Sequence, residues 1–520
     1  MKPTTRYTAR VALIVALGGF LMGFDASVIS GVIGFIKGEF DLSPFQLGWV
    51  VACLTLSATL AMLVAGPLSD RVGRRPVLRI AALLFTVSAV ASALAPNYPL
   101  LVLARMVGGL GVGAALIIAP MYIAEMAPAE IRGRLVSFNQ LNIVIGISMA
   151  FFSNYLILLA GQSEHACVQA LHIADWNWRW MLGVEALPAL VYFVALLAVP
   201  ESPRWLVMRG RNAEALSIFE KVSGRQHAHA NLAVVGDSLQ ADAFRKAASW
   251  RDLFRPAMRL ALTIGISVAV LQQITGINSV FFYAPMIFEQ SGVGTDASFM
   301  QAVLVGIVNL LFTIVAMLLI DRLGRRPLLA AGLAGIAVCM FTLSWGFGKA
   351  SYTLDTESIA ALTADVDTGL LLPLADVTHH SDIAYRSAVT DAIGAEAFAR
   401  HEAELLSVAI DINPTLILFA ILGFVASFAV SLGPVMWVLF SELFPNRLRG
   451  LAVSFAGLIN SAVSFGVQLV FPWELERFGT SATFLVYGLF AAAGLVLMLR
   501  ILPETRGRTL EELEKLLIDR

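Results

Sequence analysis

Apolar residues occur along this chain in long runs, and polar residues gather in the connections between them. A helix needs about 20 apolar residues to cross the hydrocarbon core of a bilayer. Runs of that length number six before a polar stretch and six after it. The predicted spans are 10–36, 46–68, 77–95, 99–125, 135–160, 178–199, 259–290, 297–320, 327–348, 414–440, 450–472 and 480–502. The pattern therefore predicts an all-α membrane protein of twelve transmembrane helices, in two six-helix bundles at 1–199 and 259–502.

Basic residues in the short connections predict how the spans are oriented. They follow the even-numbered spans, as Arg74 and Arg75 do after the second, whereas the loops at 96–99 and 161–177 have no Lys or Arg. Loops rich in Lys and Arg stay on the cytoplasmic side. We therefore expect both termini, including the tail at 503–520, to be cytoplasmic, with Arg74 and Arg75 anchored at the lipid surface.

Two longer polar segments interrupt the pattern. The segment 200–258 mixes both signs of charge and contains helix-like stretches, which predicts a cytoplasmic linker with short helices. The segment 349–413 falls on the outer side and holds eleven acidic residues against three basic ones. It is interpreted either as a solvated insertion or as a lid or partner-docking element, and its role stays open.

Composition agrees with a lipid environment. Of the 520 residues 58% are hydrophobic and 14% are charged, whereas soluble domains carry roughly 25% charged residues. The net charge of −1 provides no basic excess to neutralise phosphates, so a nucleic-acid partner is not expected. Three separated cysteines predict no disulfide framework. We expect no cofactor, no metal and no enzymatic activity, since no Walker loop, metal-ligand spacing or nucleophile elbow is present.

An internal repeat relates the two sets of spans. DRVGRRP at 70–76 returns as DRLGRRP at 321–327, EMAPAEIRG at 125–133 returns as ELFPNRLRG at 442–450, and PES at 200–202 returns as PET at 503–505. The insertion at 349–413 and the longer loop at 161–177 account for the changes in offset between the pairs. The chain therefore reads as two homologous halves. Parallel repeats of this kind enclose a midplane cavity and rock about it to open to each side alternately.

Several motifs resemble the sugar porter family of the major facilitator superfamily. They are GPLSDRVGRR at 66–75, RMVGGLGVG at 105–113, WRW at 178–180, PESPRWL at 200–206, QQITGIN at 272–278 and PETRGR at 503–508. The pattern is most similar to bacterial pentose or hexose proton symporters. The resemblance implies alternating-access symport of a monosaccharide with a proton by a protein that works as a monomer in the inner membrane. A facilitator of sugars or polyols is the alternative, and a membrane sugar sensor is a further one.

Asp25 and Arg105 are the predicted proton-coupling pair. Ionisable groups inside a membrane are costly and usually functional, and both residues lie inside predicted spans. Burial favours the neutral acid, whereas a nearby guanidinium favours the carboxylate, so a switch between these surroundings would bind and release a proton. The resemblance implies that the two residues pair. A static structural ion pair is the alternative.

Amides inside the spans are the predicted sugar contacts, because an amide offers both a donor and an acceptor to a hydroxyl. The resemblance makes candidates of these amides and of two aromatic residues, although amides that join helices are the alternative. The residues are Gln140, Gln272, Gln273, Asn278, Asn309, Asn460, Trp437 and Phe282.

Charged residues at the cytoplasmic loops are expected to form ion pairs that open and close that side, although anchoring of the topology is the alternative. They are Asp70, Arg71, Arg75, Glu125, Arg132, Glu201, Arg204, Asp321, Arg322, Arg326, Glu442, Arg449 and Glu504.

Overall fold

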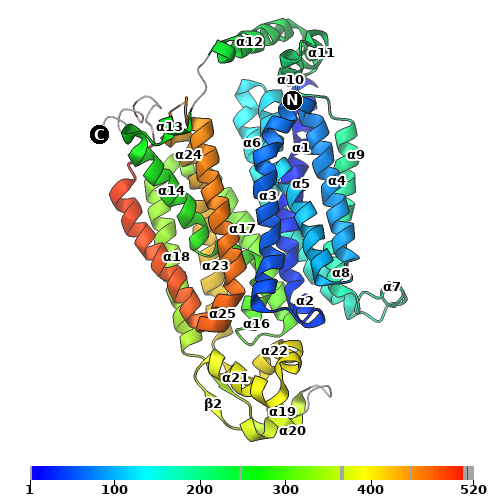
Figure 1. Ribbon diagram of the computed structural model, residues 1–520, viewed down its shortest axis with the longest axis vertical. Helices are drawn as coiled ribbons and strands as arrows, with labels where there is room; N and C mark the ends of the chain where they lie inside the picture. The colour runs from blue at the N-terminus through cyan, green and yellow to red at the C-terminus, as the bar shows by residue number, and fades with distance from the viewer. Residues whose placement is uncertain (1–2, 245–248, 363–367, 446, 507–511, 513–520) are drawn as a thin grey trace. The chain divides into compact units, whose positions relative to one another are not determined.

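Helices make up almost all of the described chain (Figure 1). The computed structural model describes residues 3–244, 249–362, 368–445, 447–506 and 512. Within these residues, 11 helical stretches are long and apolar enough to cross a membrane. The last of them, Arg449–Ile501, is divided by Gly479, whose φ of 78° lies outside the helical region. The division yields two spans from one stretch, and the predicted twelve-helix membrane fold is confirmed.

The packing divides the chain into two compact units. Unit 1 comprises Met1–Val28, Cys53–Ala150 and Arg179–Ala247, and unit 2 comprises Ile29–Ala52, Phe151–Trp178 and Ala248–Arg520. Helices of the first half are α1 (Pro3–Val28), η1 (Ile29–Gly31), α2 (Ile33–Glu39), α3 (Pro44–Val72), α4 (Arg74–Ala93), α5 (Tyr98–Met126), α6 (Ala129–Gly161), α7 (Ala166–Ala170), α8 (Asn177–Gly183) and α9 (Ala186–Leu197). The division of the sequence into halves at 199 and 259 stays a prediction.

Two spans of the second half, the seventh and the tenth, are interrupted. The helices of this half are α14 (Arg259–Ile274), α15 (Ile277–Phe282), α16 (Ala284–Glu289), α17 (Thr295–Leu323), α18 (Arg325–Gly348), α23 (Pro414–Val430), α24 (Leu432–Leu443) and α25 (Arg449–Ile501). The seventh span breaks at Gly276, whose φ of 90° suits glycine. A Cβ at Gly276 would lie 2.5 Å from the Tyr487 ring, so this break needs glycine for two reasons. The tenth span breaks at Ser431.

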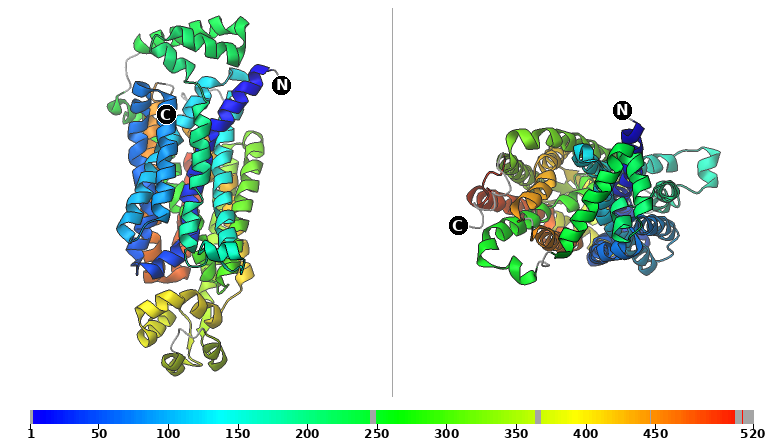
Figure 2. Two further views of the ribbon diagram at one scale, coloured as in Figure 1. Left: turned by 90° about the vertical axis from the view of Figure 1, so that its right-hand side faces the viewer. Right: turned by 90° about the horizontal axis from the view of Figure 1, so that it is seen from above.

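The segment between the two sets of spans is mostly helical. It contains α10 (Pro203–Met208), α11 (Asn212–Ser223), α12 (Arg225–Phe244), α13 (Trp250–Leu253) and the 3-10 turn η2 (Pro256–Met258). The Ser202 side chain caps α10 by accepting a hydrogen bond from the Trp205 backbone N–H at 3.3 Å. In unit 1, α11 packs against α1 and α12, at the end of the unit where the N-terminus lies (Figure 2).

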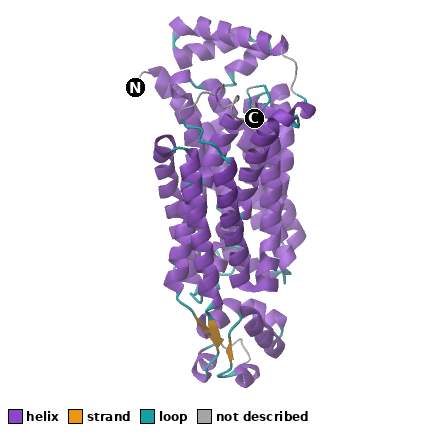
Figure 3. Ribbon diagram, turned by 90° about the vertical axis from the view of Figure 1, so that its left-hand side faces the viewer, coloured by secondary structure: helices purple, strands orange, loops and turns teal. Residues whose placement is uncertain are grey.

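The segment at 349–413 folds with a core of its own rather than as an extended loop. Its elements are β1 (Ser351–Thr353), α19 (Thr356–Ala361), α20 (Thr368–Leu371), η3 (Leu372–Leu374), β2 (Thr378–His379), α21 (Asp382–Ile393), α22 (Ala395–Ala409) and β3 (Ile410–Asp411). The strands form an antiparallel sheet in the order β2-β1-β3 (Figure 3). Buried side chains such as Tyr352, Tyr385 and Leu405 fill the core between strands and helices. We call this described segment the outer domain, after the side of the membrane on which the sequence predicts it to lie.

Two glycines allow α1 and α6 to touch backbone to backbone in unit 1. A Cβ at Gly23 would lie 2.0 Å from the carbonyl oxygen of Ile143, and one at Gly146 would lie 2.0 Å from that of Phe20. Small residues permit such close approaches between membrane helices. The contact holds α1, which carries Asp25, in a fixed position against α6.

Candidate functional site

Asp25 and Arg105 meet inside unit 1, between α1 and α5. The Arg105 Nη1 donates to Asp25 Oδ1 at 3.1 Å, and Nη1 and Nη2 donate to the Asp25 carbonyl oxygen at 3.4 and 3.3 Å. Both side chains are only 2% exposed. Asp25 Oδ2 has no hydrogen-bond partner among the described residues. One carboxylate oxygen is therefore held by the guanidinium, while the other can accept a proton.

A glycine provides the space for this second oxygen. A Cβ at Gly108 would lie 2.7 Å from Asp25 Oδ2 and 2.5 Å from the Ser88 hydroxyl. Any side chain at Gly108 would thus collide with the group that we expect to be protonated. The motif RMVGGLGVG places this glycine one turn after Arg105 on the same helix.

Glu185 is a second buried acid that the sequence reasoning missed. It lies between α8 and α9, is 3% exposed, and its Oε1 has no hydrogen-bond partner in the described part of the chain. Its charge interacts with those of Asp25 and Arg105. The signal was present, because Glu185 is an acid within the predicted span 178–199, and an acid at such a position indicates function by default.

Four of the predicted sugar-contact amides form one hydrogen-bonded cluster inside unit 2. Gln273 Nε2 donates to Gln272 Oε1 at 3.1 Å and to Asn460 Oδ1 at 3.2 Å. Gln273 Oε1 accepts from Asn278 Nδ2 at 2.7 Å, and Asn460 Nδ2 donates to Gln272 Oε1 at 2.7 Å. Asn278 also donates to the Ser464 hydroxyl at 2.7 Å. α14, α15 and α25 supply these groups, and the break at Gly276 brings Asn278 back toward Gln273.

The paired amides can exchange their partners for a ligand. A buried amide without a partner is costly, and here the amides satisfy one another. A molecule rich in hydroxyl groups offers equivalent donors and acceptors, so it can replace these bonds with little loss. Gln272 and Asn460 keep further anchors to the carbonyl oxygens of Leu432 and Ala269, at 3.4 and 2.9 Å. The cluster is therefore held in place while its inner bonds remain exchangeable.

Among the described residues, no hydrogen bond joins the other predicted sugar contacts to this cluster. Phe282 is buried at the end of α15, whereas Trp437 on α24 is 45% exposed and packs edge-on against Phe440. Asn309 is buried on α17 and makes no hydrogen bond to the four amides in the described part of the chain. Gln140 is exposed on α6 in unit 1. Their roles as sugar contacts stay predictions.

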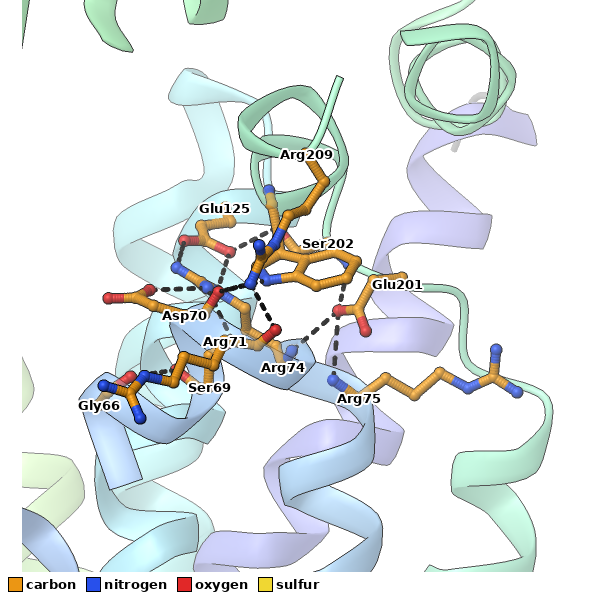
Figure 4. A network of polar contacts seen from close by, with 11 residues as sticks. Gly66, Ser69, Asp70, Arg71, Arg74, Arg75, Glu125, Glu201, Ser202 and Arg209 are labelled. Carbon is orange, nitrogen blue, oxygen red and sulfur yellow. Dashed lines mark hydrogen bonds and ion pairs between the residues drawn. The ribbon is translucent and has the colours of Figure 1, made fainter. Parts of the chain in front are cut away.

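A charged cluster in unit 1, where α3 ends and α4 begins, centres on Arg74 (Figure 4). Its guanidinium binds both oxygens of Glu125, at 3.0 and 3.1 Å, and pairs with Asp70 at 2.8 Å. Glu201 accepts from the backbone N–H groups of Arg74 and Arg75 at 3.0 and 3.2 Å. These N–H groups begin α4, where a carboxylate is favoured by the helix dipole.

Unit 2 repeats three kinds of contact from this cluster among its described residues. Arg325 pairs with Glu442 at 2.8 Å, as Arg74 does with Glu125. Glu504 accepts from the backbone N–H groups of Arg325 and Arg326, both at 3.1 Å. The Thr505 hydroxyl donates to Glu442 at 2.7 Å, in the place where Ser202 donates to Glu125. The repeated motifs of the sequence thus build the same ion-pair cluster twice.

Arg74 corrects an expectation from the sequence. It was expected to anchor at the lipid surface, but it is 4% exposed and lies at the centre of the cluster. Arg132 and Arg449 were expected to pair with acids, and this stays a prediction. Each donates through its Nε to a backbone carbonyl five residues earlier, that of Ala127 at 3.4 Å or Phe444 at 3.3 Å. The sequence around Arg74 contains no local pattern that would predict its burial, because neighbouring arginines in the same loop are more exposed.

The remaining predicted gating residues lie around these clusters. Arg71, Arg322 and Arg326 are exposed, Arg204 is half-buried, and the side chain of Asp321 lies outside the described residues. The Arg71 carbonyl accepts a hydrogen bond from Arg209 (Figure 4). Their gating role stays a prediction.

Replacing Arg74 by Ala is expected to cost about 3–5 kcal/mol of unfolding free energy in unit 1, since it leaves the mostly buried Glu125 without its cation. We expect a lower thermal midpoint in detergent and a transport rate reduced at least tenfold. Arg79→Ala is the matched control, because within the described residues Arg79 on the same helix donates to the backbone carbonyls of Leu196 and Leu197 and to no carboxylate. Equal losses in both variants would contradict the role given to the cluster.

Comparisons with known proteins agree with this arrangement. Residues 11–364 and 393–517 match the family model described as sugar (and other) transporter. The chain is 34% identical to the arabinose-proton symporter of Bacillus subtilis, over 99% of this chain and 97% of that protein. It is 33% identical to the D-xylose-proton symporter of Escherichia coli K12, over 98% of this chain and 96% of that protein. An inward-open structure of the xylose transporter of Escherichia coli superimposes with a TM-score of 0.73 at 31% identity, covering 98% of this chain and 99% of that one.

Proposed function

The chain belongs to the family of sugar (and other) transporters, and from this premise we propose that it is a proton-coupled monosaccharide symporter that works by alternating access. The observation that carries the proposal is the buried pair of Asp25 and Arg105, with one carboxylate oxygen bound and the other free to take a proton. The relatives that couple arabinose or xylose to protons support the choice of substrate class.

In this proposal Asp25 alternates between two states. When Asp25 is ionised, Arg105 binds it, and its negative charge disfavours ionisation of Glu185. Protonated at Oδ2, Asp25 no longer neutralises Arg105, and the charge of Glu185 then balances that guanidinium. The proton thus changes which acid balances the buried cation, and this change can be linked to the movement of α1 against α5. The sugar adds no charge of its own, so the transported charge is that of the proton.

The amide cluster in unit 2 is the proposed sugar site. Sugar hydroxyls replace the bonds among Gln272, Gln273, Asn278 and Asn460, and the anchors to Leu432 and Ala269 keep the amides aligned. Gln140, Asn309, Trp437 and Phe282 complete the proposed set of contacts. The clusters around Arg74 and Arg325 tie the cytoplasmic ends of helices together within each unit, and we assign them the cytoplasmic gating role. Both termini are cytoplasmic in this proposal, and a monomer is the working unit.

Uptake into proteoliposomes tests the proposal. Radiolabelled arabinose, xylose, glucose and myo-inositol are supplied with an inside-alkaline pH gradient, with a sodium gradient, or with neither. We expect at least one monosaccharide to accumulate above its external concentration only with the pH gradient, and a protonophore to collapse the accumulation. Sodium-driven accumulation, or equilibration without accumulation for every sugar, would contradict proton symport.

A further inference from the structure

A cluster of charges joins the outer domain to the outer end of the first span. Glu402 on α22 accepts from Lys37 on α2 and from Arg386 on α21, and Arg386 also donates to the Gln290 side chain that follows α16. The side chains are largely buried, with exposed fractions of 23% for Lys37, 12% for Glu402 and 19% for Arg386. All four residues belong to unit 2.

The charge of Glu402 is present at every ordinary pH. Burial alone would raise its pKa, but the positive charges of Arg386 and Lys37 and their hydrogen bonds lower the pKa to about 2. The carboxylate therefore stays ionised and attracts Lys37 above that value. Because Arg386 and Gln290 remain bound to Glu402, departure of Lys37 does not leave a buried charge without a partner. The contact with Lys37 is the one that can open.

The outer domain, which carries Glu402, contacts the second-half helices at further sites. The Asp382 carboxylate at the start of α21 accepts from the Thr480 backbone N–H at 2.8 Å and from its hydroxyl at 3.0 Å. These groups lie at the Gly479 turn that divides the last two spans. Near the end of the seventh span, a Cβ at Gly292 would lie 2.2 Å from Ile410 of β3. The domain is thus fastened to second-half helices at two places apart from Lys37.

The helix that carries Lys37 follows a break in the first span. α1 belongs to unit 1, whereas η1 and α2 belong to unit 2, and the chain changes unit between Val28 and Ile29. A 3-10 segment within a helix often marks a hinge. Beyond this break, Phe35 of α2 packs edge-on against Phe299 of α17, with ring centroids 6.5 Å apart. The contacts that hold α2 on the second half therefore include this aromatic pair and the ion pair of Lys37.

A cavity of about 190 Å³ lies beside this contact. Lys37 and Gly34 of α2, Glu289 of α16 and Glu402 of α22 are among the residues that line it. Glycine at position 34 leaves open space where a Cβ would be. Water in the cavity can hydrate the Lys37 ammonium group when it leaves Glu402, which lowers the cost of opening.

We propose that Glu402 and Lys37 form a latch by which the outer domain closes the extracytoplasmic entrance, and that this latch opens once in each transport cycle. The proposal rests on the alternating access of the proposed function. When the latch is closed, α2 packs on α16, α17 and α22. When it opens, α2 swings at η1 and uncovers the cavity to the outside. The outer domain is thereby a working part of the gate, and Arg386 positions Glu402.

Thiol labelling measures the opening without any sugar. Gly34→Cys is introduced into a chain that lacks Cys53, Cys167 and Cys339, and its reaction with a membrane-impermeant maleimide is timed from the outside. We expect Lys37→Gln to raise the labelling rate about tenfold, because the partly buried ion pair is lost, and Lys37→Arg to restore the slow rate. Lys349→Gln, which removes an exposed lysine, is the matched control and should change nothing. Equal rates in Lys37→Gln and the control would overturn the proposal.

Cross-linking tests whether opening is required for transport. Lys37→Cys and Glu402→Cys are joined by a short reducible bifunctional thiosulfonate, and sugar counterflow is measured before and after reduction. We expect counterflow to stop when the two are joined and to return on reduction. The control pair is Thr353→Cys with Thr378→Cys, whose hydroxyls face each other at 2.8 Å across β1 and β2, and it should leave counterflow intact. Full counterflow through the Lys37–Glu402 link would overturn the latch.

Kinetics separate the latch from a merely structural contact. Loss of the latch raises the population open to the outside, and the apparent affinity for external sugar rises with the competent fraction. Lys37→Gln should therefore lower the KM for external sugar and lower kcat, whereas simple destabilisation would lower only the amount of active protein. If the chain carries no sugar at all, the proposed function fails, and the labelling result still decides the latch.

Discussion

Replacing Asp25 by Asn is expected to abolish uphill accumulation of sugar while sparing sugar exchange. Asparagine has the shape of the protonated acid but cannot release a proton, so the step that links the pH gradient to the cycle is lost. Exchange of internal for external sugar needs only the loaded carrier, which the variant resembles. We expect accumulation to fall to the equilibrium level, and counterflow to stay within about threefold of the original rate. Both are measured in the same proteoliposomes.

Two further variants make this result specific. Arg105 remains buried in Asp25→Asn and still reaches the Asp25 carbonyl oxygen, so a thermal unfolding curve must show that the variant is folded. Glu185→Gln separates the two acids: we expect it to slow coupled uptake more than exchange, without the complete loss of accumulation expected for Asp25→Asn. Proton-driven accumulation that survives in Asp25→Asn would refute the assignment of the proton to Asp25.

Replacing Gln273 by Ala is expected to weaken sugar binding by about ten- to a hundredfold. Gln273 is the centre of the amide cluster, with bonds to Gln272, Asn278 and Asn460. Its removal takes away one donor and one acceptor for the sugar and leaves Asn460 Oδ1 without the donor that it has here. The sugar Kd, measured by calorimetry on the purified protein, should rise, while proton coupling in any remaining uptake should persist.

The control for this variant is Gln468, a buried amide on α25 outside the four-amide cluster. Gln468 donates to the Ser464 hydroxyl at 2.8 Å, two turns beyond Asn460, and is 1% exposed. Gln468→Ala should lower the thermal midpoint while leaving the sugar Kd nearly unchanged. A Kd that moves equally in both variants would mean that the four amides only join helices and do not bind sugar.

Much of the membrane architecture was predictable because lipid imposes a simple rule on the sequence. The spans follow from apolar runs of sufficient length. The motif repeated at 70–76 and 321–327 predicted two related halves, and the structure has similar ion pairs at Arg74 and Arg325. The pairing of Asp25 with Arg105 was expected from the family resemblance, and the structure brings the two side chains together. Of the predicted amides, the three within QQITGIN, namely Gln272, Gln273 and Asn278, form one hydrogen-bonded cluster with Asn460 of the eleventh span.

What the sequence left undecided depends on contacts between distant segments. By itself it determined the number of spans and the repeat, because both are local patterns that solvation by lipid enforces. Tertiary structure alone decided that Arg74 is buried, that Glu185 interacts with Asp25, and that the segment at 349–413 folds with its own core. Lys37 and Glu402 are 365 positions apart in the sequence. Their opposite charges meet only because the outer domain folds onto α2 and α16. An ion pair between such distant residues requires proximity in space, so no local sequence pattern predicts it.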